Sequence, residues 1–215
     1  MSQSQKSNVD YPHAITARLW EPIQPVDRGN RYEDPLADEL SRREQGTVDG
    51  GGSSLSAEGE IQFADIELRL VNLDDALHFA RSLLESMGAP VGSELLIQRD
   101  GSKHTVPFGV AECLAIYLDG ATLPDEVYAE SDVNDLVEQV ENAAAPKGGQ
   151  FRSYWEGPTE TALYLYGPSA EAMLVSLESL LASYPLCQNA RIVVRHGNPA
   201  LQPRTFRVPR QRDDA

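Results

Sequence analysis

Apolar and polar residues alternate along several short segments of the chain, which is the pattern of half-buried β-strands. In the longest of these segments, residues 60–71, Ile66, Leu68 and Leu70 occupy alternate positions. Further strands are predicted at residues 15–20, 94–98, 104–108, 112–118, 151–155, 161–166 and 191–195. Glycine-containing turns follow several of them, so tight connections between neighbouring strands are expected.

Three other segments repeat their apolar residues every three or four positions, which predicts amphipathic helices. They span residues 73–87, 133–145 and 170–184, with Asn72, Ser131 or Asp132, and Ser169 as the expected N-caps. Pro185 cannot continue the third helix, because proline has no backbone N–H. This helix has a wide apolar stripe that includes Leu174, Leu177 and Leu181, and Glu171 faces away from the stripe.

A strand–helix–strand step therefore occurs three times, with strands near Leu68, Leu114 and Leu163. Such steps, joined by hairpins, predict an α+β fold in which helices cover one face of a mainly antiparallel sheet, in a ferredoxin-like pattern. Whether the three units share one sheet or divide between two remains open at this stage.

The segments outside these units are expected to be less regular. Pro22, Pro25 and Pro35 favour an irregular N-terminal arm over residues 1–45. The first unit is expected at residues 46–110, beginning with a glycine-rich stretch that is predicted to be the most flexible part of the chain. The second and third units are expected at residues 111–197, continuous with the first. Residues 198–215 form a basic tail, in which residues 205–208 are a candidate edge strand.

Composition excludes some classes of partner. The chain of 215 residues has 33 acidic and 18 basic residues, a net charge of −15, so like charge disfavours nucleic acid and anionic membrane surfaces as partners. No apolar run approaches the roughly 18 residues that a membrane-spanning helix needs. Cys113 and Cys187 stand alone in apolar surroundings, which predicts two buried, reduced thiols and a cytoplasmic protein. The oligomeric state is left open.

No pattern of catalytic or metal-binding residues is evident. The four histidines have no partner at metal-ligand spacing, and the chain has neither a nucleophile-elbow motif nor a phosphate-binding glycine motif. Its three lysines give little support to Schiff-base or phosphoryl chemistry. We therefore expect no metal, no cofactor and no enzymatic activity.

Charge is unevenly distributed, because residues 112–141 contain nine acidic residues and no lysine or arginine. Four of the acids recur every third residue along the second predicted helix, which places them as a stripe on its exposed side. The stripe is either a solvated helix face or a surface that meets a cationic partner; next to it, residues 123–128 are expected to offer apolar anchors on a loop. The candidate partner-binding residues are Asp119, Asp125, Glu126, Tyr128, Glu130, Asp132, Asp135, Glu138 and Glu141.

Three stretches resemble a group of acidic bacterial immunity proteins from polymorphic and contact-dependent toxin systems. They are LAIYLDGATLPDEVY (114–128), SYWEGPTETALYLYG (153–167) and YPLCQ (184–188). Residues 46–92 resemble another portion of such proteins, and the likeness extends over roughly residues 46–197. It implies a protein that binds and occludes a cognate toxin domain, with an acidic face over a basic cleft. It implies no catalytic residue and does not identify the toxin.

Two other functions are open. A regulatory module that binds a small ligand would need a pocket lined by Tyr154, Trp155 and Tyr164. A hydrolase would need convergent carboxylates such as Glu156 and Glu160 around a cleft.

Overall fold

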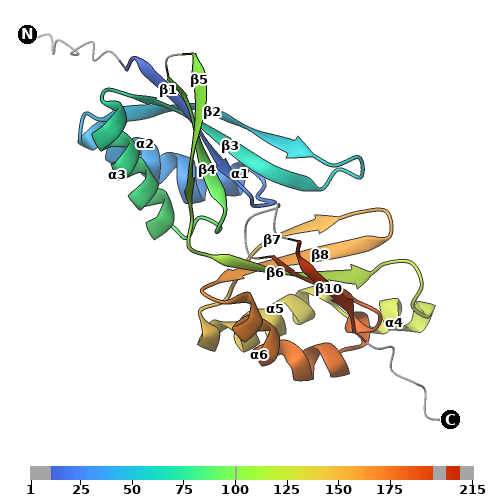
Figure 1. Cartoon of the computed structure of the whole chain (residues 1–215). Coiled ribbons are helices and arrows are strands. Elements are labelled where there is room, and N and C mark those ends of the chain that lie inside the picture. Colours follow the sequence, from blue (N-terminus) through green and yellow to red (C-terminus); the bar gives the residue numbers. More distant parts are fainter. Residues whose placement is uncertain (1–10, 100, 196–201, 209–215) are drawn as a thin grey trace, which may run out of the picture.

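The structure, a computed structural model, describes residues 11–99, 101–195 and 202–208 of the chain. These residues form two five-stranded antiparallel sheets with their own helices, so the predicted α+β fold class is confirmed. Figure 1 shows that the two sheets come from successive parts of the chain, the first coloured blue to green and the second green to red. We call residues 11–110 the first half and residues 111–208 the second half.

The two halves have the same order of strands. The first half contains β1 (His13–Leu19), α1 (Pro25–Arg28), the π-helical turn η1 (Gly29–Glu33), α2 (Asp34–Arg42), β2 (Gly46–Leu55), β3 (Ile61–Leu70), α3 (Leu73–Ser86), β4 (Ser93–Arg99) and β5 (Ser102–Phe108). The second half contains β6 (Glu112–Asp119), α4 (Asp125–Glu130), α5 (Val133–Ala144), the 3-10 turn η2 (Ala145–Lys147), β7 (Gln150–Glu156), β8 (Glu160–Gly167), α6 (Ala170–Ser183), the 3-10 turn η3 (Pro185–Cys187), β9 (Arg191–Arg195) and β10 (Arg204–Arg207). The sheets read β2-β3-β1-β4-β5 and β7-β8-β6-β9-β10, so each is a ferredoxin-like unit extended by one edge strand.

The three predicted strand–helix–strand steps are present as β3-α3-β4, β6-α5-β7 and β8-α6-β9. A fourth step, β1-α2-β2, was not predicted, and it completes the first half. The four steps are divided between two sheets, which answers the question that the sequence left open.

The prediction of an irregular N-terminal arm is wrong for the described residues. The strand predicted at residues 15–20 is confirmed as β1 (His13–Leu19), but it is the central strand of the first sheet, paired with β3 on one side and β4 on the other, and not part of an irregular arm. Ile15 and Leu19 of this strand are buried in the core. Pro25 and Pro35 lie in the first turns of α1 and α2. The backbone N–H groups of a first turn have no hydrogen-bond partner within the helix, so proline is tolerated at these positions.

The glycine-rich stretch is also more regular than predicted, because it forms strand β2 and pairs with β3. Glycine is needed at position 51, where an added Cβ would lie 2.7 Å from the carbonyl oxygen of Asp65 and 2.6 Å from a carboxylate oxygen of Glu33. Beside it, Arg28 donates a 2.9 Å hydrogen bond to the carbonyl oxygen of Gly52. The missing side chains therefore let α1 and η1 approach this edge of the sheet.

Helices cover one face of each sheet (Figure 1), and the predicted N-caps are confirmed. Asn72, Asp132 and Ser169 accept hydrogen bonds from backbone N–H groups in the first turns of α3, α5 and α6. The core of the second half joins residues of β6, β8 and β9 to residues of α5 and α6, with Leu177 fully buried among them. The expected edge strand near the C-terminus is present as β10, while residues 1–10, 196–201 and 209–215 lie outside the described residues.

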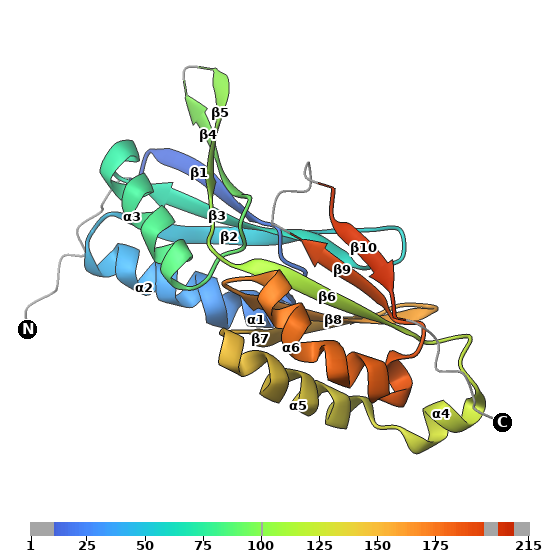
Figure 2. The ribbon, with the colours of Figure 1, turned by 60° about the horizontal axis from the view of Figure 1, so that its bottom comes forward.

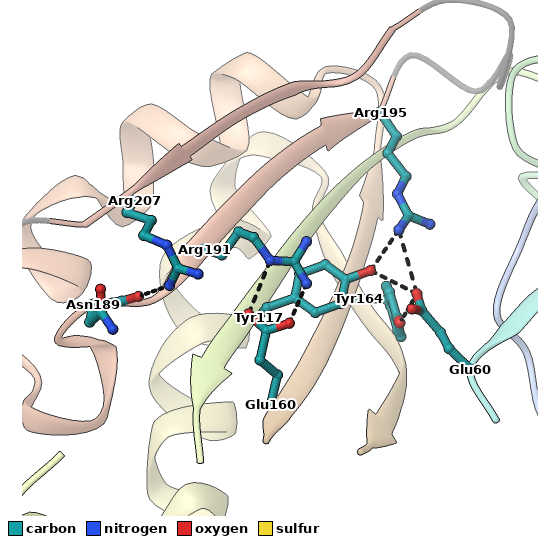
Figure 3. Close-up of polar contacts among 8 residues, drawn as sticks. All are labelled: Glu60, Tyr117, Glu160, Tyr164, Asn189, Arg191, Arg195 and Arg207. Atoms are coloured by element: carbon teal, nitrogen blue, oxygen red, sulfur yellow. Dashed lines mark hydrogen bonds and ion pairs between the residues drawn. The ribbon is translucent and has the colours of Figure 1, made fainter. Parts of the chain in front are cut away.

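The opposite face of the second sheet carries tyrosines and meets the first half. Tyr117 and Tyr164 are buried, and each donates a 2.7 Å hydrogen bond to the same carboxylate oxygen of Glu60, from the turn that joins β2 to β3 (Figure 3). Arg195 donates a 2.6 Å hydrogen bond to the Tyr117 hydroxyl. Burial raises the pKa of Tyr117 to about 12, so its hydroxyl keeps the proton that it donates. The β2–β3 hairpin thereby joins the two halves.

A second polar contact between the halves centres on Arg152 of β7. Its guanidinium lies 3.4 Å from the carboxylate of Glu21 and donates a 2.9 Å hydrogen bond to the carbonyl oxygen of Gly88. The Tyr32 hydroxyl donates a 2.7 Å hydrogen bond to the other oxygen of Glu21. Arg152 also lies 4.8 Å from the centre of the Tyr166 ring, within the range of a cation–π contact. A buried ion pair thus connects the two halves.

Candidate functional site

The structure places most of the predicted partner-binding residues on the two helices that follow β6. Figure 2 shows α4 and α5 one after the other along one side of the second half. Seven of the nine residues are exposed there, namely Asp125, Glu126, Glu130, Asp132, Asp135, Glu138 and Glu141. We call these seven carboxylates the acidic face.

The acids of α5 follow the predicted stripe. Asp132 caps the helix, and its side chain accepts a 2.8 Å hydrogen bond from the backbone N–H of Asn134. Asp135 accepts hydrogen bonds from Gln139, one turn later, and from the hydroxyl of Tyr184 at the end of α6. These contacts hold the start of α5 against α6 while leaving its carboxylates exposed to solvent.

The segment before α5 differs from the prediction, because residues 125–130 form the short helix α4 instead of a loop. Tyr128, expected as an exposed anchor, is half-buried and packs against the core of the second half. Its hydroxyl donates to the carbonyl oxygen of Asp119 and accepts from the backbone N–H of Leu123. Tyr128 therefore fixes the turn between β6 and α4.

Asp119 is not part of the acidic face, since its side chain is buried in the turn after β6. One carboxylate oxygen accepts the backbone N–H groups of Ala121 and Thr122, and the other accepts the side-chain amide of Asn189 at 2.6 Å. Burial alone raises the pKa of Asp119, but the hydrogen bonds outweigh it and lower the pKa to about 2. The residue stabilises the turn in its charged form.

This geometry predicts a pH-dependent contribution to stability. With a folded-state pKa of about 2 against an ordinary 3.8, Asp119 stabilises the fold above pH 4, and the contribution disappears as the pH falls towards 2. Asp119→Asn should lower the free energy of unfolding at pH 6 by about 1 kcal/mol and flatten its change below pH 4. Denaturant titrations at several pH values check this, with exposed Asp125→Asn as the control; identical slopes for wild type and Asp119→Asn would contradict it.

The acidic face is not neutralised by the described cations. None of its seven carboxylates forms an ion pair with a lysine or arginine in the described ranges. The two described arginines of the C-terminal strand bind elsewhere: Arg204 pairs with Glu171 on α6, and Arg207 donates to the carbonyl oxygen of Asn189. Within the described ranges, the negative charge of this face is therefore not compensated by a paired cation.

A groove of about 720 Å³ adjoins the acidic face, between the start of α5 and the end of the second sheet. The side chains of Leu118, Phe151 and Leu163 line it from the sheet, and Val137 lines it from α5. Two apolar side chains at the groove are exposed to solvent, Tyr154 of β7 by 56% and Val133 of α5 by 38%. We call this feature the α5–β7 groove. It was not predicted from the sequence.

The structure does not bring together the residues that the two other functions require. Tyr154 pairs with Leu163 and faces the helices, whereas Tyr164, the next residue of β8, is fully buried on the opposite face. Trp155 packs against the same cluster as Tyr164, so only these two of the three aromatic residues lie together. Glu156 lines the groove, but Glu160 lies on the opposite face of the sheet, where it pairs with Arg191 (Figure 3). The tyrosine pocket and the carboxylate pair that were considered are therefore wrong.

Both cysteines are buried and unpaired, as predicted. Burial raises the pKa of Cys113 to about 11 and that of Cys187 to about 12, so neither sulfur is a ready nucleophile. Within the described part of the chain, no three histidine, cysteine or acidic side chains lie close enough to hold a metal ion together. Among the described helices, none has both the length and the apolar character needed to cross a membrane.

Comparison with known proteins does not identify a family for this chain. No protein-family model and no curated protein matches the chain. The regulatory subunit of aspartate kinase from Thermus thermophilus is 14% identical over 80% of this chain and 94% of its own, with a TM-score of 0.26. An unknown protein from Galdieria sulphuraria is 15% identical over 85% of this chain and 96% of its own, with a TM-score of 0.25. Both TM-scores are low, and the α+β fold class follows from the strand order of the two sheets.

Proposed function

We propose that the protein is a binding protein that occludes a cationic protein partner with the acidic face of its second half. The observation that carries the proposal is the set of seven exposed carboxylates on α4 and α5, none of which is paired with a described lysine or arginine. The resemblance of residues 114–128 to immunity proteins of bacterial toxin systems makes a toxin domain with a basic cleft the partner class to test first.

The mechanism is electrostatic steering followed by steric occlusion. Complementary charge accelerates encounter, and steered association reaches about 10⁸–10⁹ M⁻¹s⁻¹ at low salt. Two features make the face rigid: Asp132 caps α5, and the Tyr184 hydroxyl joins the start of α5 to the end of α6. A rigid surface loses little conformational entropy on binding, so it covers a cleft without first having to be ordered.

Charge reversal tests the proposal directly. The triple variant Glu130→Lys, Glu138→Lys and Glu141→Lys, which leaves the Asp132 cap of α5 in place, should slow association with the partner by about tenfold or more at low salt. The reading frame upstream of the gene is examined first; a secreted protein with a C-terminal toxin domain encoded there would supply the partner, and association with that domain is measured by stopped-flow fluorescence. Circular dichroism checks that α5 remains folded.

A matched control distinguishes the effect of the acidic face on association from the effect of a change in net charge. The triple variant Asp38→Lys, Glu58→Lys and Glu178→Lys makes the same change in charge at exposed positions away from α4 and α5. It should leave association within about twofold of wild type. Equal slowing by the two triple variants, or no slowing by the first, would refute the assignment of the binding surface.

A further inference from the structure

We infer that the α5–β7 groove is the anchor site for the partner, and that it takes an apolar side chain flanked by arginine or lysine residues of a cationic polypeptide segment. The inference rests on the proposed function and identifies the chemistry that the acidic face recognises. Charge governs encounter, whereas the groove supplies the contact that slows dissociation.

The groove exists because the helices do not cover the whole of the second sheet. The chain leaves β6 at Asp119, passes through α4 and begins α5 only at Val133, so the helix-facing surface at this end of the sheet stays open. Leu118 and Leu163 line the groove from two neighbouring strands but are themselves buried, so its solvent-exposed apolar surface comes from Tyr154 and Val133 and from the half-buried Phe151 and Val137. An apolar surface that its own helices leave open is suited to an apolar side chain from elsewhere.

The exposed side chains of the groove are of the kind found at binding hot spots. Tyr154 stands on the edge strand β7 with more than half of its surface exposed, and Val133 lines the same groove from the first turn of α5. Tyrosine supplies a large, stiff contact area with a polar tip, which is why it is enriched where partners bind. Burying the apolar surface of both residues would favour a complex.

The charge around the groove determines which segment fits. Asp132 at the start of α5 and Glu156 at the end of β7 both line the groove, and no lysine or arginine lines it among the described residues. The acidic face continues from Asp132 along α5. An apolar side chain in the groove would thus have carboxylates on both sides, and basic neighbours in the partner complement them. The ring of Tyr154 offers an additional surface for a guanidinium. The volume of about 720 Å³ lies within the range of ligand sites.

Short peptides test the anchor without knowledge of the natural partner. The probes are two blocked peptides, one with leucine between two pairs of arginines and one with serine in its place. Affinity is measured in every protein from NMR shifts of the Val137 and Leu163 methyl groups, which line the groove and are unchanged in the variants, at millimolar peptide. In the wild type, shifts of the Val133 methyl groups and the Tyr154 ring locate the contact. We expect the leucine peptide to bind about tenfold more tightly, and Tyr154→Ser with Val133→Ser to abolish that difference. Val175→Ser, at an exposed apolar position on α6, is the control and should preserve it.

The outcomes separate the anchor from the proposed function. Equal affinity for the two peptides, with both weakened by the triple charge reversal on α4 and α5, would overturn the anchor and leave the acidic face as the binding surface. Failure of both peptides to shift Val133 and Tyr154 would also overturn the anchor. A tenfold preference for leucine that survives in the Tyr154→Ser, Val133→Ser variant would place the apolar contact elsewhere.

Discussion

Leu177→Asp is expected to unfold the second half of the protein. Leu177 is fully buried on α6, between that helix and the sheet. The substitution removes about 1.5–3 kcal/mol of apolar burial and places a carboxylate without a cation in the core, which costs several kcal/mol more. The sum is comparable with the whole stability of an ordinary domain. Thermal unfolding followed by near-ultraviolet circular dichroism should show loss of the tertiary signal at room temperature.

Ser179→Asp is the matched control, because it adds the same carboxylate to the exposed side of α6. It should shift the thermal midpoint by a few degrees at most. If Leu177→Asp retained the wild-type midpoint, the placement of α6 against the sheet would be wrong.

Arg152→Met should destabilise the joint between the two halves by about 3–5 kcal/mol, because it leaves the Glu21 carboxylate buried without its cation. The Arg152 side chain is only 5% exposed and that of Glu21 is fully buried. Burial already raises the pKa of Glu21, and loss of Arg152 raises it further. A raised folded-state pKa favours the protonated fold, so the variant should lose stability as the pH rises and regain part of it towards pH 5.

Denaturant titrations between pH 5 and 8 measure this effect, and adding Glu21→Gln should restore part of the lost stability at pH 8. Arg18→Met removes a comparable but more exposed ion pair with Asp65 and should cost no more than about 1 kcal/mol. Equal effects of Arg152→Met and Arg18→Met would show that the buried pair does not stabilise the joint between the halves.

Much of the architecture could be predicted from the sequence, because its signals are local. The caps Asn72, Asp132 and Ser169 each act within one helical turn, and Pro185 ends α6 through its own backbone. The alternation of apolar and polar residues within residues 61–70 indicates a strand with one buried and one more exposed face. These features do not depend on the rest of the fold.

The first strand–helix–strand step was missed because its composition is shaped by contacts that are distant in sequence. Pro25 and Pro35 suggested an irregular arm, yet each lies in a helical first turn that tolerates proline. The glycines of β2 suggested flexibility, whereas Gly51 is constrained by the carbonyl oxygen of Asp65 and by Glu33. Only the packing of α1 and η1 on that edge reveals why glycine is needed.

The candidate site was predicted in part. The stripe of acids on α5 follows from residue spacing, and the four carboxylates are exposed as expected. The groove is lined by residues of β6, β7, β8, α4 and α5, so no local sequence pattern predicts it. Strand alternation could have separated Tyr154 from Tyr164 once β7 and β8 were paired, but a bulge near Phe151 shifts the register of that pairing.

The salt dependence of association tests the central claim most directly. The logarithm of the association rate constant with the cationic partner should fall steeply with salt for the wild type and for the control variant Asp38→Lys, Glu58→Lys, Glu178→Lys. The fall should be much shallower for Glu130→Lys, Glu138→Lys, Glu141→Lys. The same slope in all three proteins would contradict the proposal that the acidic face of α4 and α5 receives the partner.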